Sequence, residues 1–290
     1  KLNGSSLRIA LQNTGRLTRD SLELLHGIGL EFEDQSRRLF AQCRNHDLEL
    51  LFVRDDDIPE YVQDGVADLG IVGRNVVLEH GARVRELEPL GFGHCTLSLA
   101  VPRGSRARTP ADLEGARIAT THPATLRRYL EKEGIGAEVV EIRGATELAP
   151  ALDVADAICD LVSTGTTLRV HDLRRLADLA ESVAVLVANP EALWTPDRAA
   201  LIGRLTTRIR GLLTARRLKY VTLNAPKTAL AAIREILPGM RSPTVVPLAE
   251  PDMVAVHAAV EEQVFWEAME RLKAAGASEI LVLPVEKVMP

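Results

Sequence analysis

The sequence predicts an α/β protein with a separate C-terminal module, and three observations lead to that prediction. Its 290 residues are enough for two or three domains of roughly 100 to 200 residues each. Through the first two-thirds, short apolar runs alternate with helix-like segments, which is typical of α/β folds. From residue 219 onward the expected order becomes β-α-β-β-α-β, the split unit of a ferredoxin-like fold.

The strands expected in the first region are short and rich in Val, Ile, Leu and Ala. They cover residues 7–11, 48–53, 69–72, 97–101, 117–120, 138–142, 157–162 and 183–188. Helix-like spacing occurs between them, at residues 17–27, 58–64, 125–133 and 147–152. Strands that alternate with helices indicate largely parallel sheets, which place ligands at the carboxyl ends of their strands.

Two breaks then divide the chain. A hinge is expected at residues 89–93, where Leu-Gly-Phe-Gly precedes a new strand. The second break is expected at residues 189–196, and there a long helix begins at Thr195-Pro196-Asp197, with Thr as its cap and Pro in its first turn, and runs to about Arg217. Beyond it we expect strands at 220–223, 244–248, 254–260 and 280–285, and helices at 228–237 and 264–275.

Composition excludes several classes of protein. The formal charge is −5 and the basic residues are scattered, which argues against a nucleic-acid binder. No apolar run approaches the roughly 18 residues of a membrane helix, and the polar residues 1–6 do not resemble a signal peptide. The three cysteines are an odd number without metal-ligand spacing, which favours a reducing compartment. We therefore expect a cytoplasmic protein.

The most informative segment is an apolar strand that runs into a hydroxyl-rich loop. Backbone N–H groups and four hydroxyls at the start of a helix can hold a phosphate without a lysine. Asp156 and Asp160 precede the loop, where carboxylates can accept hydrogen bonds from sugar hydroxyls. Together these features suggest a 5-phosphoribosyl group; alternatively, the loop only caps a helix and Asp160 is exposed at a strand end. The loop residues are Ser163, Thr164, Gly165, Thr166 and Thr167.

The segment Asp-Leu-Val-Ser-Thr-Gly-Thr-Thr-Leu at 160–168 closely resembles the phosphoribosyl-pyrophosphate loop of the ATP phosphoribosyltransferase family. Other segments that resemble the family follow in its order, at 8–17, 53–59, 68–75, 117–120, 242–244 and 276–284. The resemblance implies two α/β lobes arranged like a periplasmic binding protein, an active site in the cleft and the C-terminal regulatory domain of the long form. The implied domains are lobe I at 1–93 with 180–217, lobe II at 94–179 and the regulatory domain at 218–290.

The resemblance also implies an activity, the transfer of phosphoribosyl from phosphoribosyl pyrophosphate to N1 of ATP, which starts histidine biosynthesis. Asp156 and Asp160 would fix the ribose hydroxyls, and the loop would hold the 5-phosphate. Mg²⁺ would enter with the pyrophosphate, without a dedicated protein site. For the ATP side we expect Arg54 and one of the next two carboxylates in the cleft. The candidate residues there are Arg16, Arg54, Asp55, Asp56 and Gly73. Alternatively, Arg16 lies in a solvated turn, the acidic residues start a helix, and Gly73 only ends a strand.

For regulation, the long-form family implies inhibition by histidine, with active dimers and an inhibited hexamer. Asn224, Thr244 and Ser278 are the candidate histidine contacts, or else part of an oligomer surface. Three other functions remain open: a two-lobed solute-binding protein, a nucleotide-salvage phosphoribosyltransferase and a catalytically silent regulatory partner. The seven histidines do not cluster in the sequence, and none is expected in catalysis.

Overall fold

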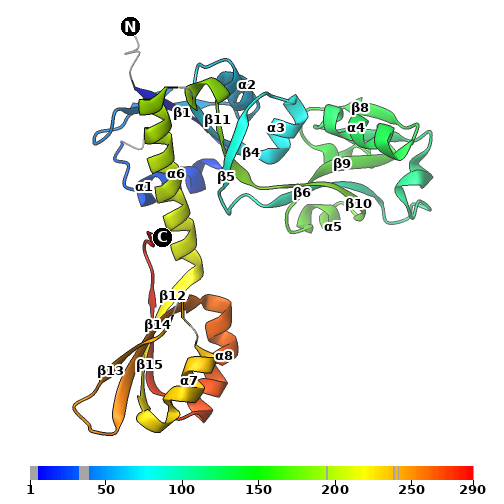
Figure 1. The fold of residues 1–290 in the computed structure, drawn as a ribbon. Helices are drawn as coiled ribbons and strands as arrows, with labels where there is room; N and C mark the ends of the chain where they lie inside the picture. The colour runs from blue at the N-terminus through cyan, green and yellow to red at the C-terminus, as the bar shows by residue number, and fades with distance from the viewer. Residues whose placement is uncertain (1–5, 33–38, 194, 238, 241, 290) are drawn as a thin grey trace. The chain divides into compact units, whose positions relative to one another are not determined.

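The computed structural model describes residues 6–32, 39–193, 195–237, 239–240 and 242–289 (Figure 1). It divides into two compact units, Lys1–Gly203 and Arg204–Pro290. The described part of the first unit contains a six-stranded and a five-stranded sheet, and the second unit contains a four-stranded sheet. The long helix α6 (Pro196–Arg217) begins where its Thr-Pro signal predicts.

The six-stranded sheet has a parallel centre and antiparallel edges. Its order is β2-β3-β1-β4-β11-β5, and only the pairs β3-β1 and β1-β4 are parallel. Ile9, Leu50 and Ile71 are buried in the parallel strands, because these runs are apolar on both faces. The strands are β1 (Leu7–Gln12), β2 (Phe40–Gln42), β3 (Leu48–Val53), β4 (Leu69–Gly73), β5 (Arg85–Pro89) and β11 (Ala184–Ala188). The associated helices are α1 (Thr18–Gly27), α2 (Ile58–Gln63) and α3 (Arg74–His80).

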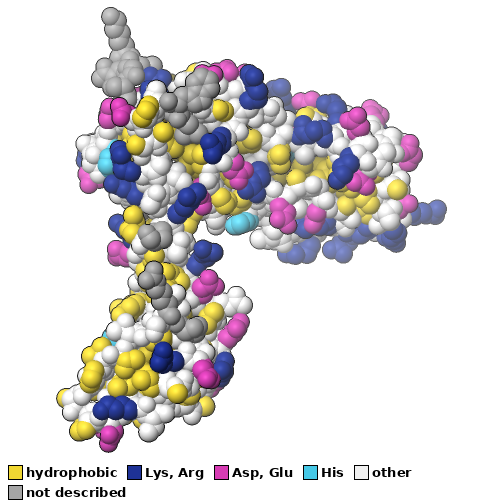
Figure 2. All heavy atoms as spheres, viewed as in Figure 1, with side chains coloured by type: hydrophobic (Ala, Val, Ile, Leu, Met, Phe, Trp, Pro, Cys, Tyr) yellow, Lys and Arg dark blue, Asp and Glu magenta, His cyan; other side chains and the backbone are white. Residues whose placement is uncertain are grey.

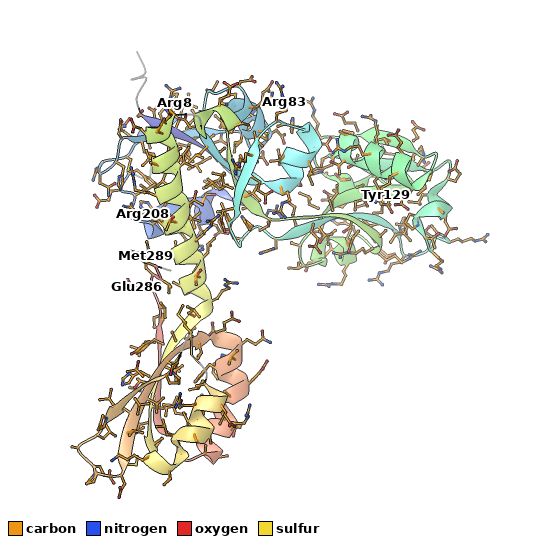
Figure 3. The ribbon with its side chains drawn as sticks, in the orientation of Figure 1. Arg8, Arg83, Tyr129, Arg208, Glu286 and Met289 are labelled. Atoms are coloured by element: carbon orange, nitrogen blue, oxygen red, sulfur yellow. The ribbon has the colours of Figure 1, made fainter. Side chains whose placement is uncertain are left out.

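The five-stranded sheet is also mixed. Its order is β10-β6-β9-β7-β8, with β7 parallel to β8 and β9, and with β6 antiparallel to β9 and β10. Its core contains Leu99, Ile118 and Leu126, and Tyr129 of α4 packs against that core (Figure 3). The strands are β6 (Cys95–Pro102), β7 (Arg117–Thr120), β8 (Glu138–Glu141), β9 (Ala157–Val162) and β10 (Leu173–Ser182), and the helices are α4 (Pro123–Glu133) and α5 (Thr166–Val170).

The expectation of largely parallel sheets is wrong, and the connections explain why. The chain passes between the two sheets from β5 to β6 and returns from β10 to β11, without a helix in either connection. Strands that follow or precede these two connections therefore run antiparallel to a neighbour in their sheet, as β6 and β10 do to each other and β11 does to β4. The helix expected at 147–152 is also wrong, since only a 3-10 turn at Thr146–Leu148 forms there.

Strand β10 escaped sequence analysis because its periodicity is not that of a regular strand. Leu173, Leu176 and Leu179 recur every three residues, which is closer to a helical period. The pairing of β10 with β6 contains register shifts between Arg175 and Ala177 and between Asp178 and Ala180. Each irregularity breaks the simple alternation of faces, so the apolar period lengthens from two to three.

The second unit has the β-α-β-β-α-β order that the sequence predicts. Its antiparallel sheet has the order β13-β14-β12-β15, with both helices on one face (Figure 1). Val221, Leu223, Val256, Phe265 and Leu272 form part of the core between them. The elements are β12 (Leu218–Pro226), α7 (Leu230–Ile236), β13 (Thr244–Pro247), β14 (Met253–Glu261), α8 (Glu262–Ala274) and β15 (Ser278–Pro284). The exact limits of the two lobes and the regulatory domain stay a prediction.

Three further features of the described residues concern charge, membrane crossing and the cysteines. On the face shown in Figure 2, basic and acidic side chains are interspersed over the first unit. Across the described ranges, no helix combines the length and the apolar character that a membrane crossing needs. Cys43, Cys95 and Cys159 are free and buried.

We predict that Gly70→Ala destabilises the first unit by about 1–3 kcal/mol, the usual cost of overpacking a core. A Cβ at Gly70 would be 2.7 Å from Cγ2 of Ile58 and 2.9 Å from Cγ2 of Val62, both buried on α2. Urea unfolding measures the change. Gly104→Ala is the matched control because its Cβ would meet nothing within 4 Å, and equal stability of the two variants would contradict the packing argument.

Candidate active site

The carboxyl ends of parallel strands from both sheets of the first unit open onto one cavity of ≈ 700 Å³. Residues after β3 and β4 line it from the six-stranded sheet, and residues after β7 and β8 line it from the five-stranded sheet. This is the position at which α/β sheets hold ligands. The lining used below comprises Arg54, Asp55, Asp56, Asn75, Glu79, Thr121, His122, Glu141 and Arg143.

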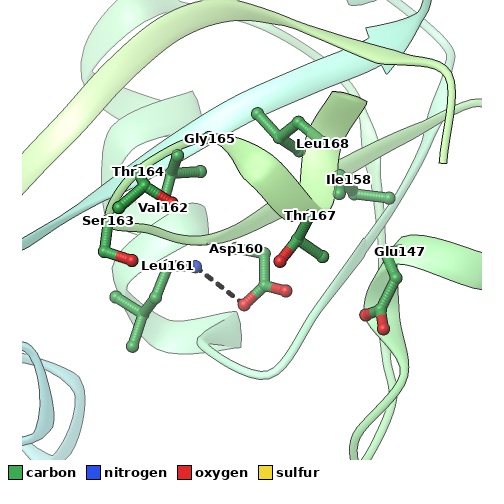
Figure 4. A pocket seen from close by; sticks show the side chains of 10 residues that line it. All are labelled: Glu147, Ile158, Asp160, Leu161, Val162, Ser163, Thr164, Gly165, Thr167 and Leu168. Carbon is green, nitrogen blue, oxygen red and sulfur yellow. Dashed lines mark hydrogen bonds between the residues drawn. The ribbon is translucent and has the colours of Figure 1, made fainter. Parts of the chain in front are cut away.

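The predicted phosphate loop follows β9 and lines a second, smaller pocket (Figure 4). Gly165 has φ +72°, a left-handed conformation that suits glycine, and it allows the chain to turn into α5. Thr164 Oγ1 and Thr166 Oγ1 are 3.0 Å apart, and Arg169 Nη2 donates to Thr166 Oγ1 at 3.0 Å. The guanidinium of Arg169 therefore adds a positive charge beside the loop, which sequence analysis did not find.

Asp160 lines this pocket together with Ser163 and Thr167, and its side chain lies near that of Thr167 (Figure 4). Its Oδ1 accepts a hydrogen bond from the N–H of Leu161 at 2.7 Å. Burial raises the pKa of Asp160, although that hydrogen bond and nearby His122 oppose the rise. Leu161 lines both this pocket and the larger cavity, so the two are neighbours.

Asp156 is a correction to the sequence prediction, because the structure does not bring it to the loop. It precedes β9 at the opposite end of the strand, about 13 Å from Asp160 at roughly 3.3 Å per residue. Its carboxylate accepts hydrogen bonds from the N–H of Arg117 at 2.9 Å and from Arg117 Nη2 at 3.1 Å. The side-chain hydrogen bond from Arg117 is the main reason why the pKa of Asp156 is lowered. The spacing of four residues along a strand separates these carboxylates rather than pairing them.

The ATP-side candidates fall into two groups. Arg54, Asp55 and Asp56 line the larger cavity, and burial is the main cause that raises the pKa of Asp55. Arg16 and Gly73 are not among the residues that line this cavity. Arg16 Nη2 instead donates to Cys95 Sγ at 3.3 Å. Gly73 is buried at the start of α3, where an added Cβ would be 2.4 Å from Oδ1 of Asn75. Substrate contacts by any of these residues stay a prediction.

The expectation that no histidine takes part in catalysis stays a prediction, but the structure places His122 in the larger cavity. It follows β7, is 8% exposed and lines the larger cavity. Its Nε2 is 3.0 Å from Asn75 Nδ2, and its Nδ1 is 2.9 Å from Thr121 Oγ1. Burial lowers the pKa of His122 in spite of several nearby carboxylates. The sequence contains no local signal for this position, because the partner Asn75 is 47 residues away, on helix α3 of the six-stranded sheet.

Glu79 on α3 connects the two sheets by capping α4. Its Oε1 accepts from the N–H of Ala124 at 2.7 Å and its Oε2 from the N–H of Thr125 at 2.8 Å. These are N–H groups of the first turn of α4, which have no partner within the helix. Burial acts to raise the pKa of Glu79, but its hydrogen bonds from Thr125 and Ala124 together lower it. An acidic group at a helix N-terminus is also favoured by the helix dipole.

In the second unit, the structure places the histidine candidates on one face of the sheet. Asn224 is paired in register with Ser278, and Thr244 is paired with His257. Asn224 Nδ2 donates to Glu279 Oε2, and Ser278 Oγ donates to the main-chain oxygen of Asn224 at 3.4 Å. Their face is opposite to the core residues Val221 and Leu223, because side chains alternate along β12. Thr244 is separated from the other two by β14.

Comparison with known proteins matches the chain in two successive regions. The family model "ATP phosphoribosyltransferase" matches residues 54–211, and "HisG, C-terminal domain" matches residues 215–287. An ATP phosphoribosyltransferase of Maricaulis maris is 45% identical over 98% of this chain and 99% of its own. The chain belongs to the ATP phosphoribosyltransferase family. An ATP phosphoribosyltransferase of Cytophaga hutchinsonii is 43% identical, with 98% of each chain covered.

A solved structure of the same family has a similar fold over much of the chain. The ATP phosphoribosyl transferase (HisG:HisZ) complex from Thermotoga maritima matches with a TM-score of 0.61 and 29% identity. The match covers 98% of that chain and 70% of this one. The predicted α/β fold class is therefore confirmed: the first unit has two α/β sheets, and residues 215–287 match the family's C-terminal domain. As a family member, the chain is a transferase of histidine biosynthesis.

We predict that Glu79→Gln lowers the free energy of unfolding at pH 7 by about 1–2 kcal/mol, because two helix N–H groups lose a charged acceptor. The folded-state pKa of Glu79 is lowered, so its stabilisation is present above the unfolded value of about 4.3 and is lost as pH falls through the folded value. Urea unfolding of both proteins at pH 7 and pH 3 measures this.

The control for this experiment is Glu131→Gln, an exposed position on α4. We expect it to leave stability almost unchanged at both pH values. A Glu79→Gln cost that is equally large at pH 3 and pH 7 would show that the carboxylate charge is not what stabilises the contact.

Proposed function

We propose that the chain transfers the 5-phosphoribosyl group from phosphoribosyl pyrophosphate to N1 of the adenine of ATP. The products are phosphoribosyl-ATP and pyrophosphate. The observation that carries this proposal is the hydroxyl-rich loop beside Asp160, next to a cavity of ≈ 700 Å³ at the carboxyl ends of the strands. Membership of the ATP phosphoribosyltransferase family supports the same assignment.

On the phosphoribosyl side, the loop supplies donors and Asp160 supplies an acceptor. The N–H groups and hydroxyls of residues 163–167, with Arg169 beside them, suit a 5-phosphate. The carboxylate of Asp160 suits the ribose hydroxyls, since the hydrogen bond from Leu161 leaves acceptor capacity for further donors. Asp156 is not part of this proposal.

On the ATP side, Arg54 and Arg143 are the cations that line the cavity, from opposite sheets. Guanidinium groups pair well with phosphate oxygens. Because pyrophosphate leaves the anomeric carbon, the transition state should have oxocarbenium character. Catalysis then depends on positioning and on negative charge close to the ribose, which Asp160 provides.

Magnesium fits the acidic residues of the cavity as a companion of the phosphates. Within the described residues, no group of three or more His, Cys, Asp or Glu side chains is arranged to hold a metal ion by itself. Asp55, Asp56 and Glu141 line the cavity and can supply the one or two carboxylates that Mg²⁺ combines with phosphate oxygens and water. When bound to pyrophosphate, Mg²⁺ neutralises charge on the leaving group.

We also propose that histidine binds the second unit and inhibits, and that the chain forms homo-oligomers, with dimers active and a hexamer inhibited. The match of residues 215–287 to the family's C-terminal domain supports a second functional site. Asn224 and Ser278 supply donors and acceptors beside each other on the exposed sheet face. Feedback then requires that histidine binds one global state more tightly than the other.

Pyrophosphate release from phosphoribosyl pyrophosphate and ATP with Mg²⁺ tests the activity directly. We expect turnover with ATP and none with free purine bases, which a salvage enzyme would use. A solute-binding protein or a silent regulatory partner would bind ligand without releasing pyrophosphate. Absence of turnover by the folded full-length chain would therefore overturn the proposal.

We predict that Asp160→Asn lowers kcat/KM for phosphoribosyl pyrophosphate about 10- to 100-fold, because hydrogen bonds to a charged group contribute about 1.5–3 kcal/mol. Asp156→Asn is the matched control, at the residue that precedes the same strand, and it should change kcat/KM less than about twofold. Steady-state pyrophosphate release measures both variants, with circular dichroism to check folding. Equal effects of the two substitutions would remove the special role of Asp160.

We predict that Asn224→Leu raises the histidine concentration for half inhibition about fivefold or more, because one or more hydrogen bonds to the amino acid are lost. The measurement is pyrophosphate release by the full chain over a histidine titration. Glu270→Gln on α8, on the opposite side of the sheet, should leave that concentration unchanged. Insensitivity of Asn224→Leu would place the effector elsewhere.

A further inference from the structure

Four side chains from three segments, β10, α3 and the connection between β7 and α4, form a continuous hydrogen-bonded network that ends in the large cavity. Ser182 Oγ is 2.8 Å from Asn75 Oδ1, Asn75 Nδ2 is 3.0 Å from His122 Nε2, and His122 Nδ1 is 2.9 Å from Thr121 Oγ1. Ser182, Asn75 and His122 are 3%, 6% and 8% exposed, whereas Thr121 is half-buried. Asn75, Thr121 and His122 line the cavity.

The chemistry of the groups fixes the direction of each hydrogen bond. Ser182 Oγ accepts from the main-chain N–H of Asn75 at 2.9 Å and donates its proton to Oδ1 of the same residue. The Asn75 amide thus presents its NH₂ group to His122, which must accept at Nε2. A neutral imidazole that accepts at Nε2 carries its proton on Nδ1, so it donates to Thr121 Oγ1.

The role of Thr121, the last side chain of this hydrogen-bonded network, is therefore determined as well. Thr121 Oγ1 accepts from His122 and keeps its own proton for another partner. Thr121 lines the same cavity as Arg54, which follows β3 of one sheet, and Arg143, which follows β8 of the other. In a cavity that also contains two guanidinium groups, an oxygen that accepts this proton is best supplied by a phosphate.

We propose that the Ser182–Asn75–His122 chain holds the imidazole in its neutral Nδ1–H form, so that the Thr121 hydroxyl donates to a substrate phosphate oxygen in the cavity. Thr121 then binds substrate directly, whereas His122 and Asn75 position it. The phosphate belongs to ATP or to phosphoribosyl pyrophosphate, and the experiment separates the two. The identity of these substrates rests on the proposed function.

The surroundings of His122 are consistent with a neutral ring. Glu79 on α3, Asp160 on β9, and Asp55 and Asp56 after β3 all act to raise its pKa, but burial outweighs them and lowers it. Both ring nitrogens are also occupied by groups that satisfy a neutral imidazole. A doubly protonated ring would direct Nε2–H against the NH₂ of Asn75, two donors facing each other.

The test uses the full-length chain and isosteric substitutions. In ¹⁵N-histidine NMR spectra, with the signal assigned by its loss in His122→Gln, we expect a neutral Nδ1–H tautomer from pH 6 to pH 8. Thr121→Val should raise KM for either ATP or phosphoribosyl pyrophosphate about tenfold, the factor for a hydrogen bond of about 1.4 kcal/mol, with kcat less affected. Thr121→Ser keeps the hydroxyl and should recover most of the loss.

Asn75→Asp provides an independent arm, because a carboxylate cannot donate to Nε2. The imidazole should then carry a proton on Nε2, and the same KM should rise as in Thr121→Val. An Nε2–H tautomer in the unmodified chain would overturn the proposal, as would unchanged KM values in folded Thr121→Val. If the unmodified chain releases no pyrophosphate, the proposed function is overturned, but the proposal for Thr121 is not. The NMR tautomer, and calorimetric titration of ATP and phosphoribosyl pyrophosphate onto the unmodified chain and Thr121→Val, still decide whether the hydroxyl binds phosphate.

Discussion

The contact between α3 and α4 is the constraint on which the site of the first unit depends. It brings the carboxyl ends of strands from two separate sheets around one cavity. The contact is polar: Glu79 caps α4, and buried Asn75 meets buried His122. A buried polar group without its partner costs about 1–3 kcal/mol, so these pairs specify one arrangement of the sheets more sharply than apolar packing would.

Anionic ligands must be attracted by local groups, because the chain as a whole has a net charge of −5. In our proposal, oriented donors hold the phosphate-rich ligands, namely loop N–H groups, hydroxyls and the guanidinium groups of Arg54, Arg143 and Arg169. The same cavity also contains partly buried carboxylates such as Asp55. Cations that accompany the substrates offset their charge, which is why Mg²⁺ and the phosphates enter the proposal together.

Much of the fold and part of the site could be predicted from the sequence, and the failures have physical causes. Local signals predicted the start of α6, the split β-α-β-β-α-β order and the hydroxyl-rich loop between β9 and α5, because each depends on neighbours along the chain. Asp156 was expected beside Asp160, but residues four apart on a strand lie far from each other. The position of His122 in the cavity was not predicted because its partner Asn75 comes from a distant segment, and β10 was missed because irregular pairing hides its alternation.

The placement of Asp160 bears on whether this cleft binds or catalyses. The two-lobed architecture hosts both kinds of protein, so the fold alone does not decide. A protein that only binds a ribose can recognise its hydroxyls with neutral amides, and burial of an amide costs less free energy than burial of a carboxylate. Burial raises the pKa of Asp160, so its charged form is held at an energetic cost. That cost is recovered where positive charge develops on the ribose during transfer, and interactions that strengthen only in the transition state are the ones that accelerate a reaction. A partly buried carboxylate beside this hydroxyl-rich loop is therefore better explained by transfer chemistry than by storage or transport of a ligand.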